Sequence, residues 1–107
     1  MKTKKEVLAL LIALGITTQE VAEKLVSLGI RGNKGMCTSC PIARYLIANE
    51  VEVRRVANRD VDEALEVRVG VGVSSYWYYI RDYPQLQGVR DFILAFDGGD
   101  YPQCEIY

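Results

Sequence analysis

Residues 64–73, ALEVRVGVGV, constrain the fold most strongly, because every second residue from Leu65 onward is apolar. Such a pattern predicts a β-strand with one buried face and one polar face. The apolar positions are Leu65, Val67, Val69, Val71 and Val73. A single strand cannot bury its apolar face alone, so we expect partner strands and a helical layer.

Two short segments supply the partner strands. VEVRRVA, residues 51–57, predicts a strand that the polar turn 58–63 joins to the alternating segment. YWYYI, residues 76–80, is rich in the aromatic residues that are enriched in strands, and it predicts a hairpin partner. The expected sheet is therefore antiparallel and three-stranded.

Capping patterns locate two helices near the N-terminus. The T-x-x-E pattern of a capping box begins at Thr3 and again at Thr17, each time ahead of apolar residues. A glycine, which is common just after a helix, follows each run. These signals predict helices at about 4–14 and 18–28.

Proline marks the start of two further helices. Pro41 and Pro84 suit the first turn of a helix, where the missing N–H costs nothing. We predict helices at about 41–49 and 84–97, the second of them closed by two glycines.

The N-terminal run MKTKKEVLALLIALG resembles a secretory signal, with a basic start and an apolar stretch. Glu6 interrupts the basic start, and the stretch is shorter than the roughly 20 apolar residues that a membrane span requires. We interpret it as a buried helix. Whether this helix packs on its own domain or on a second subunit stays open.

Together these elements predict an α+β fold, with about four helices on one face of a three-stranded antiparallel sheet. The chain has 107 residues, and most domains hold about 100–150. We therefore expect a single domain over residues 1–107.

Composition narrows the chemistry. The chain has no histidine, so it lacks the commonest general base and the commonest nitrogen ligand for zinc or copper. Its formal net charge of −1 gives no overall field to hold a polyanion. The three cysteines, an odd number, fit a reduced cytoplasmic setting better than a disulfide framework.

Cys37 and Cys40 form a C-x-x-C pair ahead of the Pro41 helix, and three interpretations stay open. A closed zinc site needs four ligands, and Cys104 is the only further cysteine. A thiol–disulfide pair would gain from the helix N-terminus, which stabilises a thiolate, but no predicted strand precedes the motif as in thioredoxin-like proteins. In the third interpretation the thiols only pack and cap, because cysteine is often buried.

The same loop offers a fourth use. Arg31 and Lys34 flank glycines, and backbone N–H groups at the start of a helix attract anions. A phosphate, a nucleotide or an acidic partner would then bind Arg31, Lys34, Arg44 and the Cys40 end of the helix. The alternative is a solvated loop with exposed cations.

Residues 17–30 and 39–46 resemble the two helices of a DNA-binding helix-turn-helix. About ten residues separate the predicted helices, whereas that motif has a turn of three to four. This spacing and the net charge argue against DNA binding.

The polar face of the alternating strand carries Gly70 and Gly72, which leave room for a close approach. Trp77 and Tyr79 share one face of the next strand, opposite the tyrosines at alternate positions. If helices cover only one face of the sheet, two large rings reach the surface, where they favour an interface or a ligand platform. The alternative is that the C-terminal tail covers them.

The segments CPIARYL, 40–46, and FILAFDGGDYP, 92–102, with short strands between them, resemble a group of small uncharacterised proteins of actinobacteria and their phages. The likeness covers about residues 18–104. It implies a cytoplasmic accessory protein of a bacterium or a mobile element, and it implies no activity or catalytic residue.

The sequence thus predicts a non-enzymatic binding module, expected as a homodimer, that engages a protein partner or a small anionic ligand. We expect no cofactor, no bound metal, no membrane and no nucleic acid partner. The expected contact residues are Arg31, Lys34, Cys40, Arg44, Gly70, Gly72, Trp77 and Tyr79. The alternative is a thiol–disulfide redox protein that uses Cys37 and Cys40, and a zinc-stabilised or DNA-binding domain comes third.

Overall fold

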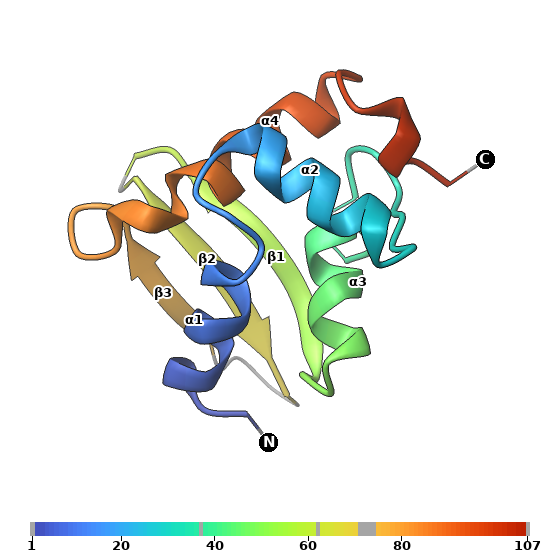
Figure 1. Cartoon of the computed structure of the whole chain (residues 1–107). Coiled ribbons are helices and arrows are strands. Elements are labelled where there is room, and N and C mark those ends of the chain that lie inside the picture. The colour runs from blue at the N-terminus through green and yellow to red at the C-terminus, as the bar shows by residue number, and fades with distance from the viewer. Residues whose placement is uncertain (1, 37, 62, 71–74, 107) are drawn as a thin grey trace.

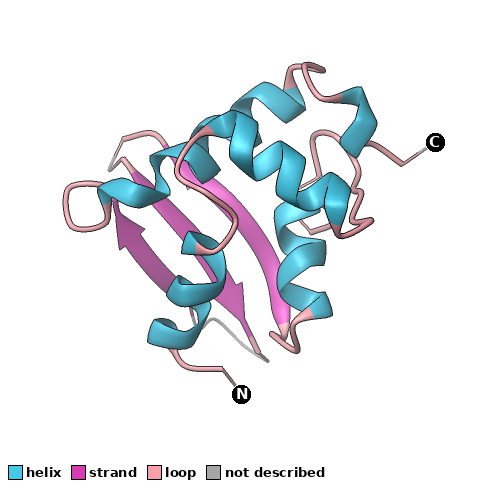
Figure 2. Ribbon diagram, in the orientation of Figure 1, coloured by secondary structure: helices cyan, strands magenta, loops and turns pink. Residues whose placement is uncertain are grey.

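The computed structural model describes residues 2–36, 38–61, 63–70 and 75–106. Its elements are α1 (Lys4–Ile12), α2 (Thr18–Ser27), α3 (Pro41–Ala48), β1 (Val53–Arg59), β2 (Ala64–Val69), β3 (Ser75–Tyr79), the 3-10 turn η1 (Pro84–Leu86), α4 (Gln87–Asp97) and the 3-10 turn η2 (Pro102–Cys104). The strands form one antiparallel sheet in the order β1-β2-β3. Figures 1 and 2 show the four described helices on one side of this sheet. The predicted α+β architecture is confirmed.

Both predicted capping boxes are present. The Thr3 hydroxyl accepts the Glu6 N–H at 3.2 Å, and the Glu6 carboxylate accepts the Thr3 N–H at 2.9 Å. Thr17 and Glu20 repeat this exchange at the start of α2. Each box satisfies donors that a helix start otherwise leaves without partners, which explains why both helices begin where the pattern predicts.

The main differences from the predicted boundaries are in three elements. Strand β2 ends at Val69, before the predicted end at residue 73, and residues 71–74 lie outside the described residues. Strand β1 runs from Val53 to Arg59, later than the expected 51–57, because its pairing with β2 continues into the polar segment up to Arg59 and Ala64. The last helix begins at Gln87, because Pro84–Leu86 forms a separate 3-10 turn.

The core lies between the sheet and the helices. Val56, Leu65, Val67 and Tyr78, which point to the helical side, each expose at most 1% of their surface. The helices contribute Val7, Leu11, Val21, Leu25, Ile42, Leu46, Val89, Phe92 and Phe96. The predicted period-two alternation therefore places Leu65, Val67 and Val69 in the core, whereas the expected Val71 and Val73 lie outside the described residues.

Helix α1 packs on its own chain. Val7 and Leu11 are fully buried, and the Tyr78 hydroxyl of β3 donates a hydrogen bond to the Lys4 carbonyl at 2.7 Å. Burial raises the pKa of the Tyr78 hydroxyl above its usual value. In the part of the chain that the structure describes, no helix is both long and apolar enough to cross a membrane.

Helix α4 approaches the connection between α1 and α2 closely at Gly88. A Cβ atom added to Gly88 would lie 2.6 Å from the carbonyl carbon and oxygen of Ile16. Glycine is therefore required here for packing, although it is a poor residue for the interior of a helix.

Candidate functional site

The side of the sheet away from the helices carries a group of arginines and aromatic rings. The strand register places Arg55, Ala57 and Arg59 of β1 beside Arg68, Glu66 and Ala64 of β2, which in turn lie beside Ser75, Trp77 and Tyr79 of β3. Directly paired residues of an antiparallel sheet share a face, and alternate residues of a strand share it too. We call these nine residues, together with Arg81, the arginine–aromatic face.

A buried carboxylate lies at the centre of this face. Glu66 exposes only 2% of its surface, and the Ser75 hydroxyl donates a hydrogen bond to its Oε2 at 2.9 Å. Guanidinium nitrogens of Arg59 and Arg68 each lie 3.6 Å from a Glu66 oxygen. A charge removed from water needs such partners. Glu66 therefore orients the two arginines that flank it.

The two rings of β3 lie side by side with cations over them. The Trp77 and Tyr79 centroids are 6.5 Å apart and the ring planes differ by 20°. The guanidinium of Arg59 lies 5.0 Å from the Trp77 centroid, and that of Arg81 lies 5.2 Å from the Tyr79 centroid. Both distances are within the range of cation–π attraction. The rings remain half-buried, so part of each is open to contact.

The described C-terminal tail packs elsewhere. The Tyr101 ring lies 5.4 Å from that of Phe92, Cys104 is fully buried, and the Cys104 carbonyl accepts the Gly32 N–H at 2.9 Å. Figure 1 shows this end of the chain beside α2 and far from β3. In the described residues, then, the tail lies away from Trp77 and Tyr79.

Gly70 has a backbone role at the end of β2. Its φ of 69° lies in the region that favours glycine, and its N–H donates to the Glu52 carbonyl at 2.8 Å. Gly72 lies outside the described residues. The expectation that these glycines leave room for an approaching group therefore stays a prediction for Gly72.

The cysteine loop presents one described thiol of the C-x-x-C pair. Cys40 is the buried N-cap of α3, and its sulfur accepts the Ala43 N–H at 3.4 Å. Cys37 lies outside the described residues, so the predicted redox pair stays untested. Burial raises the pKa of the third thiol, Cys104. No cluster of three or more histidine, cysteine or acidic side chains able to hold a metal is found among the described residues.

The predicted anion site is the region around Arg31 and Lys34, whose side chains are exposed. Some backbone donors of this loop have internal acceptors: the Asn33 N–H donates to the Ser39 carbonyl at 2.8 Å, and the Gly35 N–H donates to Asp97 Oδ1 at 2.9 Å. Nε of Arg44 donates to the Ser39 carbonyl at 3.2 Å. The N–H groups of Asn33 and Gly35 are therefore already used within the chain, and the exposed Arg31 and Lys34 side chains are the cations that an anion would contact here.

The structure thus divides the predicted contact residues between two places. Trp77, Tyr79 and Gly70 belong to or adjoin the sheet, whereas the 31–40 loop and Arg44 lie by α3 and the tail. The arginines of the sheet face and Glu66 were missed from the sequence. Their signal was present, because Arg55, Arg59, Arg68 and Glu66 occupy the polar phase of their strands, and Arg81 follows β3 two residues after Tyr79.

Comparisons with known proteins add no relative: no protein-family model, no curated protein and no solved structure matches this chain.

Proposed function

We propose that this chain is a non-enzymatic binding module whose arginine–aromatic face binds a short acidic segment of a protein partner. One observation carries the proposal. The face carries four arginines and a single carboxylate, Glu66, which Arg59 and Arg68 already pair, and two half-buried rings lie beside them.

The charge of the face is opposite in sign to that of the rest of the chain. Four arginines against one glutamate give a net +3, so the remainder carries a formal −4 to reach the total of −1. A concentrated patch of one sign attracts and orients a partner of the other sign even when the net charge is small. Arginine and aromatic residues are also enriched where binding energy concentrates.

Acidic residues at the sheet end limit the size of the partner. Asp60 follows Arg59 directly and its side chain is 80% exposed, and the exposed Asp82 follows Arg81. A long polyanion that overran the patch would meet these carboxylates. A short acidic segment would contact the arginines alone, which favours a protein segment over a nucleic acid strand.

Fluorescence anisotropy tests the proposal with a labelled peptide of glutamates around one central phenylalanine. We expect saturable binding that weakens as salt is added. The double variant Arg55→Gln/Arg81→Gln removes one half-buried and one exposed charge and should weaken binding by about tenfold, since each such charge contributes up to about 1 kcal/mol. The matched control Lys5→Gln/Lys24→Gln removes two exposed charges from α1 and α2 and should change binding little.

Two results would contradict the proposal. One is binding that Arg55→Gln/Arg81→Gln and Lys5→Gln/Lys24→Gln weaken equally, since only overall charge would then matter. The other is tight binding of a single-stranded RNA of similar length in place of the peptide, which would assign the face to nucleic acid.

The remaining expectations stay predictions from the sequence. These are the homodimer, the cytoplasmic location and the link to actinobacterial and phage proteins. The alternative function, thiol–disulfide exchange by Cys37 and Cys40, is tested by titrating thiols with and without reductant. Reversible loss of two thiols would favour it.

A further inference from the structure

A small hollow runs along the free edge of β1. Its volume is about 280 Å³, and it lies between that strand, the C-terminal half of α4 and the start of α3. Val56 and Asn58 line it from β1, together with Arg55 and Ala57 of the arginine–aromatic face. The rest of the lining is Cys40, Asp60, Ile93, Leu94 and Asp97. Small-molecule sites usually measure about 300–1,000 Å³, so this hollow suits one side chain of an extended segment better than a cofactor.

The direction of the β2 backbone determines which β1 groups face the hollow. The Ile80 N–H donates to the Glu63 carbonyl at 2.9 Å, so Glu63 and the alternate residues Leu65 and Val67 direct their backbone groups toward β3. Ala64, Glu66 and Arg68, which alternate with them, therefore direct their N–H and C=O groups toward β1.

The same alternation assigns the β1 backbone. The β1 residues paired with these three are Arg59, Ala57 and Arg55, so their backbone groups are hydrogen-bonded to β2. The N–H and C=O groups of Val56 and Asn58 therefore project from the free edge, beside the hollow that these residues line. An edge with such groups is a template for a further strand.

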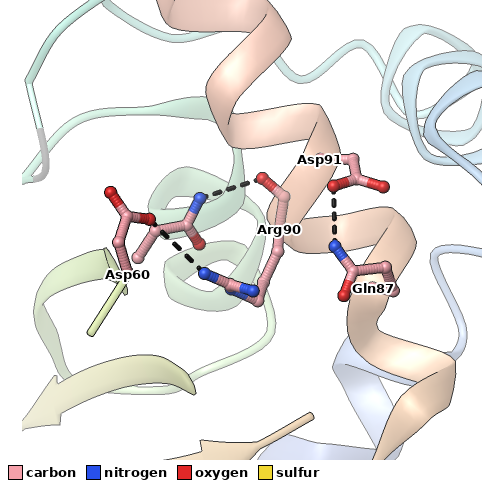
Figure 3. Close-up of polar contacts among 5 residues, drawn as sticks. Asp60, Gln87, Arg90 and Asp91 are labelled. Carbon is pink, nitrogen blue, oxygen red and sulfur yellow. Dashed lines mark hydrogen bonds and ion pairs between the residues drawn. The ribbon is translucent and has the colours of Figure 1, made fainter. Parts of the chain in front are cut away.

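The Asn58 side chain adds one more acceptor at this edge. Its Nδ2 donates to the Arg90 carbonyl at 2.9 Å, which fixes the amide, while its buried Oδ1 has no hydrogen-bond partner among the described residues. Figure 3 shows the neighbouring contact, in which the Arg90 guanidinium lies 3.5 Å from Asp60 Oδ1. A buried acceptor without a partner costs stability unless something supplies a donor.

The wall opposite the strand carries two apolar side chains beside the Asp97 carboxylate, which accepts the Gly35 N–H. Ile93 is 8% exposed and Leu94 is 55% exposed, and both lie on α4. An edge strand beside a helix with apolar side chains offers hydrogen bonds to a backbone and a pocket for one side chain.

We propose that the free edge of β1 binds an extended segment of a partner protein as a fourth strand, with one apolar side chain of that segment in the hollow. The backbone groups of Val56 and Asn58 would pair with the segment, and Asn58 Oδ1 would accept one of its N–H groups. This surface adjoins the arginine–aromatic face, because Arg55 and Ala57 also line the hollow. The pairing itself depends on the backbone of Val56 and Asn58, so the experiments below test it apart from the function proposed above.

Hydrogen exchange followed by NMR tests the edge without a ligand. The amides of Val56 and Asn58 should exchange about tenfold or more faster than the Ala57 amide between them, because only the latter is paired with β2. Equal protection of all three in dilute protein would show that the edge is already occupied and would overturn the proposal. Protection that grows with protein concentration, with a dimer in native mass spectrometry, would assign the edge to a second copy and would also overturn it.

Peptide display tests the partner. Peptides of about nine residues, enough to span a strand, are selected on the full chain, and the best binder is N-methylated at each position in turn. Methylation at alternate positions should weaken binding at least about tenfold, because only alternate amides face β1. No selected binder, or no such alternation, would overturn the proposal.

A matched pair of variants locates the binding. Leu94→Glu places a charge at the hollow and should abolish binding of the selected peptide. Ile47→Glu replaces an apolar residue of similar exposure, 50% against 55%, on α3, where it does not line the hollow, and should leave binding unchanged. If the two variants behave alike, the peptide binds elsewhere and the proposal fails.

Discussion

Leu65 and Glu66 are neighbours on β2 and both are buried, yet they face opposite sides of the sheet and are held by different forces. Leu65 lies in the apolar core under the helices, where contact is non-directional. Glu66 lies on the helix-free side, held by Ser75, Arg59 and Arg68. The helical face of the sheet therefore supplies stability, whereas the arginine–aromatic face orients charged groups that remain accessible.

The largest expected effect is on the helical face. Leu65→Ala removes a fully buried side chain and should lower the free energy of unfolding by about 2–5 kcal/mol. Urea denaturation followed by circular dichroism measures it. A loss no larger than that of a Glu66 variant would remove the proposed difference between the faces.

The helical layer also depends on close approach at Gly88. Gly88→Ala should lower the free energy of unfolding by about 1–3 kcal/mol, because the new Cβ would meet the Ile16 backbone at 2.6 Å. The control is Gly98→Ala, whose Cβ would meet ordinary contacts at 3.5 Å at a φ of −80°, and it should be near neutral. Similar melting temperatures for the two variants would count against this packing.

On the arginine–aromatic face, Glu66→Gln keeps the shape of the side chain and removes its charge. Arg59 and Arg68 then lose their shared carboxylate, but their side chains are 47% and 36% exposed, so water screens much of the loss. We expect about 1–2 kcal/mol from the buried, hydrogen-bonded position. The exposed Glu52→Gln serves as the control, and an equal effect of the two would contradict the assigned role of Glu66.

Tyr78 and Tyr79 are adjacent in β3 but lie on opposite faces of the sheet, so their variants compare the two faces directly. Tyr78→Phe removes the hydrogen bond to Lys4 and should cost about 1 kcal/mol, whereas Tyr79→Phe on the open face should cost almost nothing. Because burial raises the pKa of Tyr78 in the folded state, its hydroxyl contributes fully below the unfolded value of about 10. That contribution is lost as pH rises further, so the deficit of Tyr78→Phe should shrink above pH of about 10. A deficit that stays constant with pH would contradict this.

Much of the fold could be predicted from the sequence, because patterns of a few neighbouring residues agree with the final structure. Capping at Thr3 and Thr17, proline at position 41 and the alternation from Leu65 each act within a few residues. The start of α4 was not readable, because the preceding turn and the helix carry similar residues. The requirement for glycine at Gly88 was not readable either, since it depends on a contact with the distant Ile16.

Only part of the candidate site could be predicted from the sequence. Trp77 and Tyr79 were expected on one face, because period two fixes their phase. The arginines that join them come from three separate segments, and the pairing of Ala57 with Glu66 and of Glu66 with Trp77 brings them together. Register between strands depends on the whole sheet, which a single strand's pattern does not specify.

The most direct test uses Trp77, the chain's only tryptophan, whose indole N–H gives one separate NMR resonance. On titration with the glutamate peptide, we expect a saturable shift of this resonance and of the Ser75 and Glu66 amides. The methyl resonances of Val7 and Leu11, under the helical face, should stay in place. A shift confined to residues of the 31–40 loop, with the indole unchanged, would contradict it.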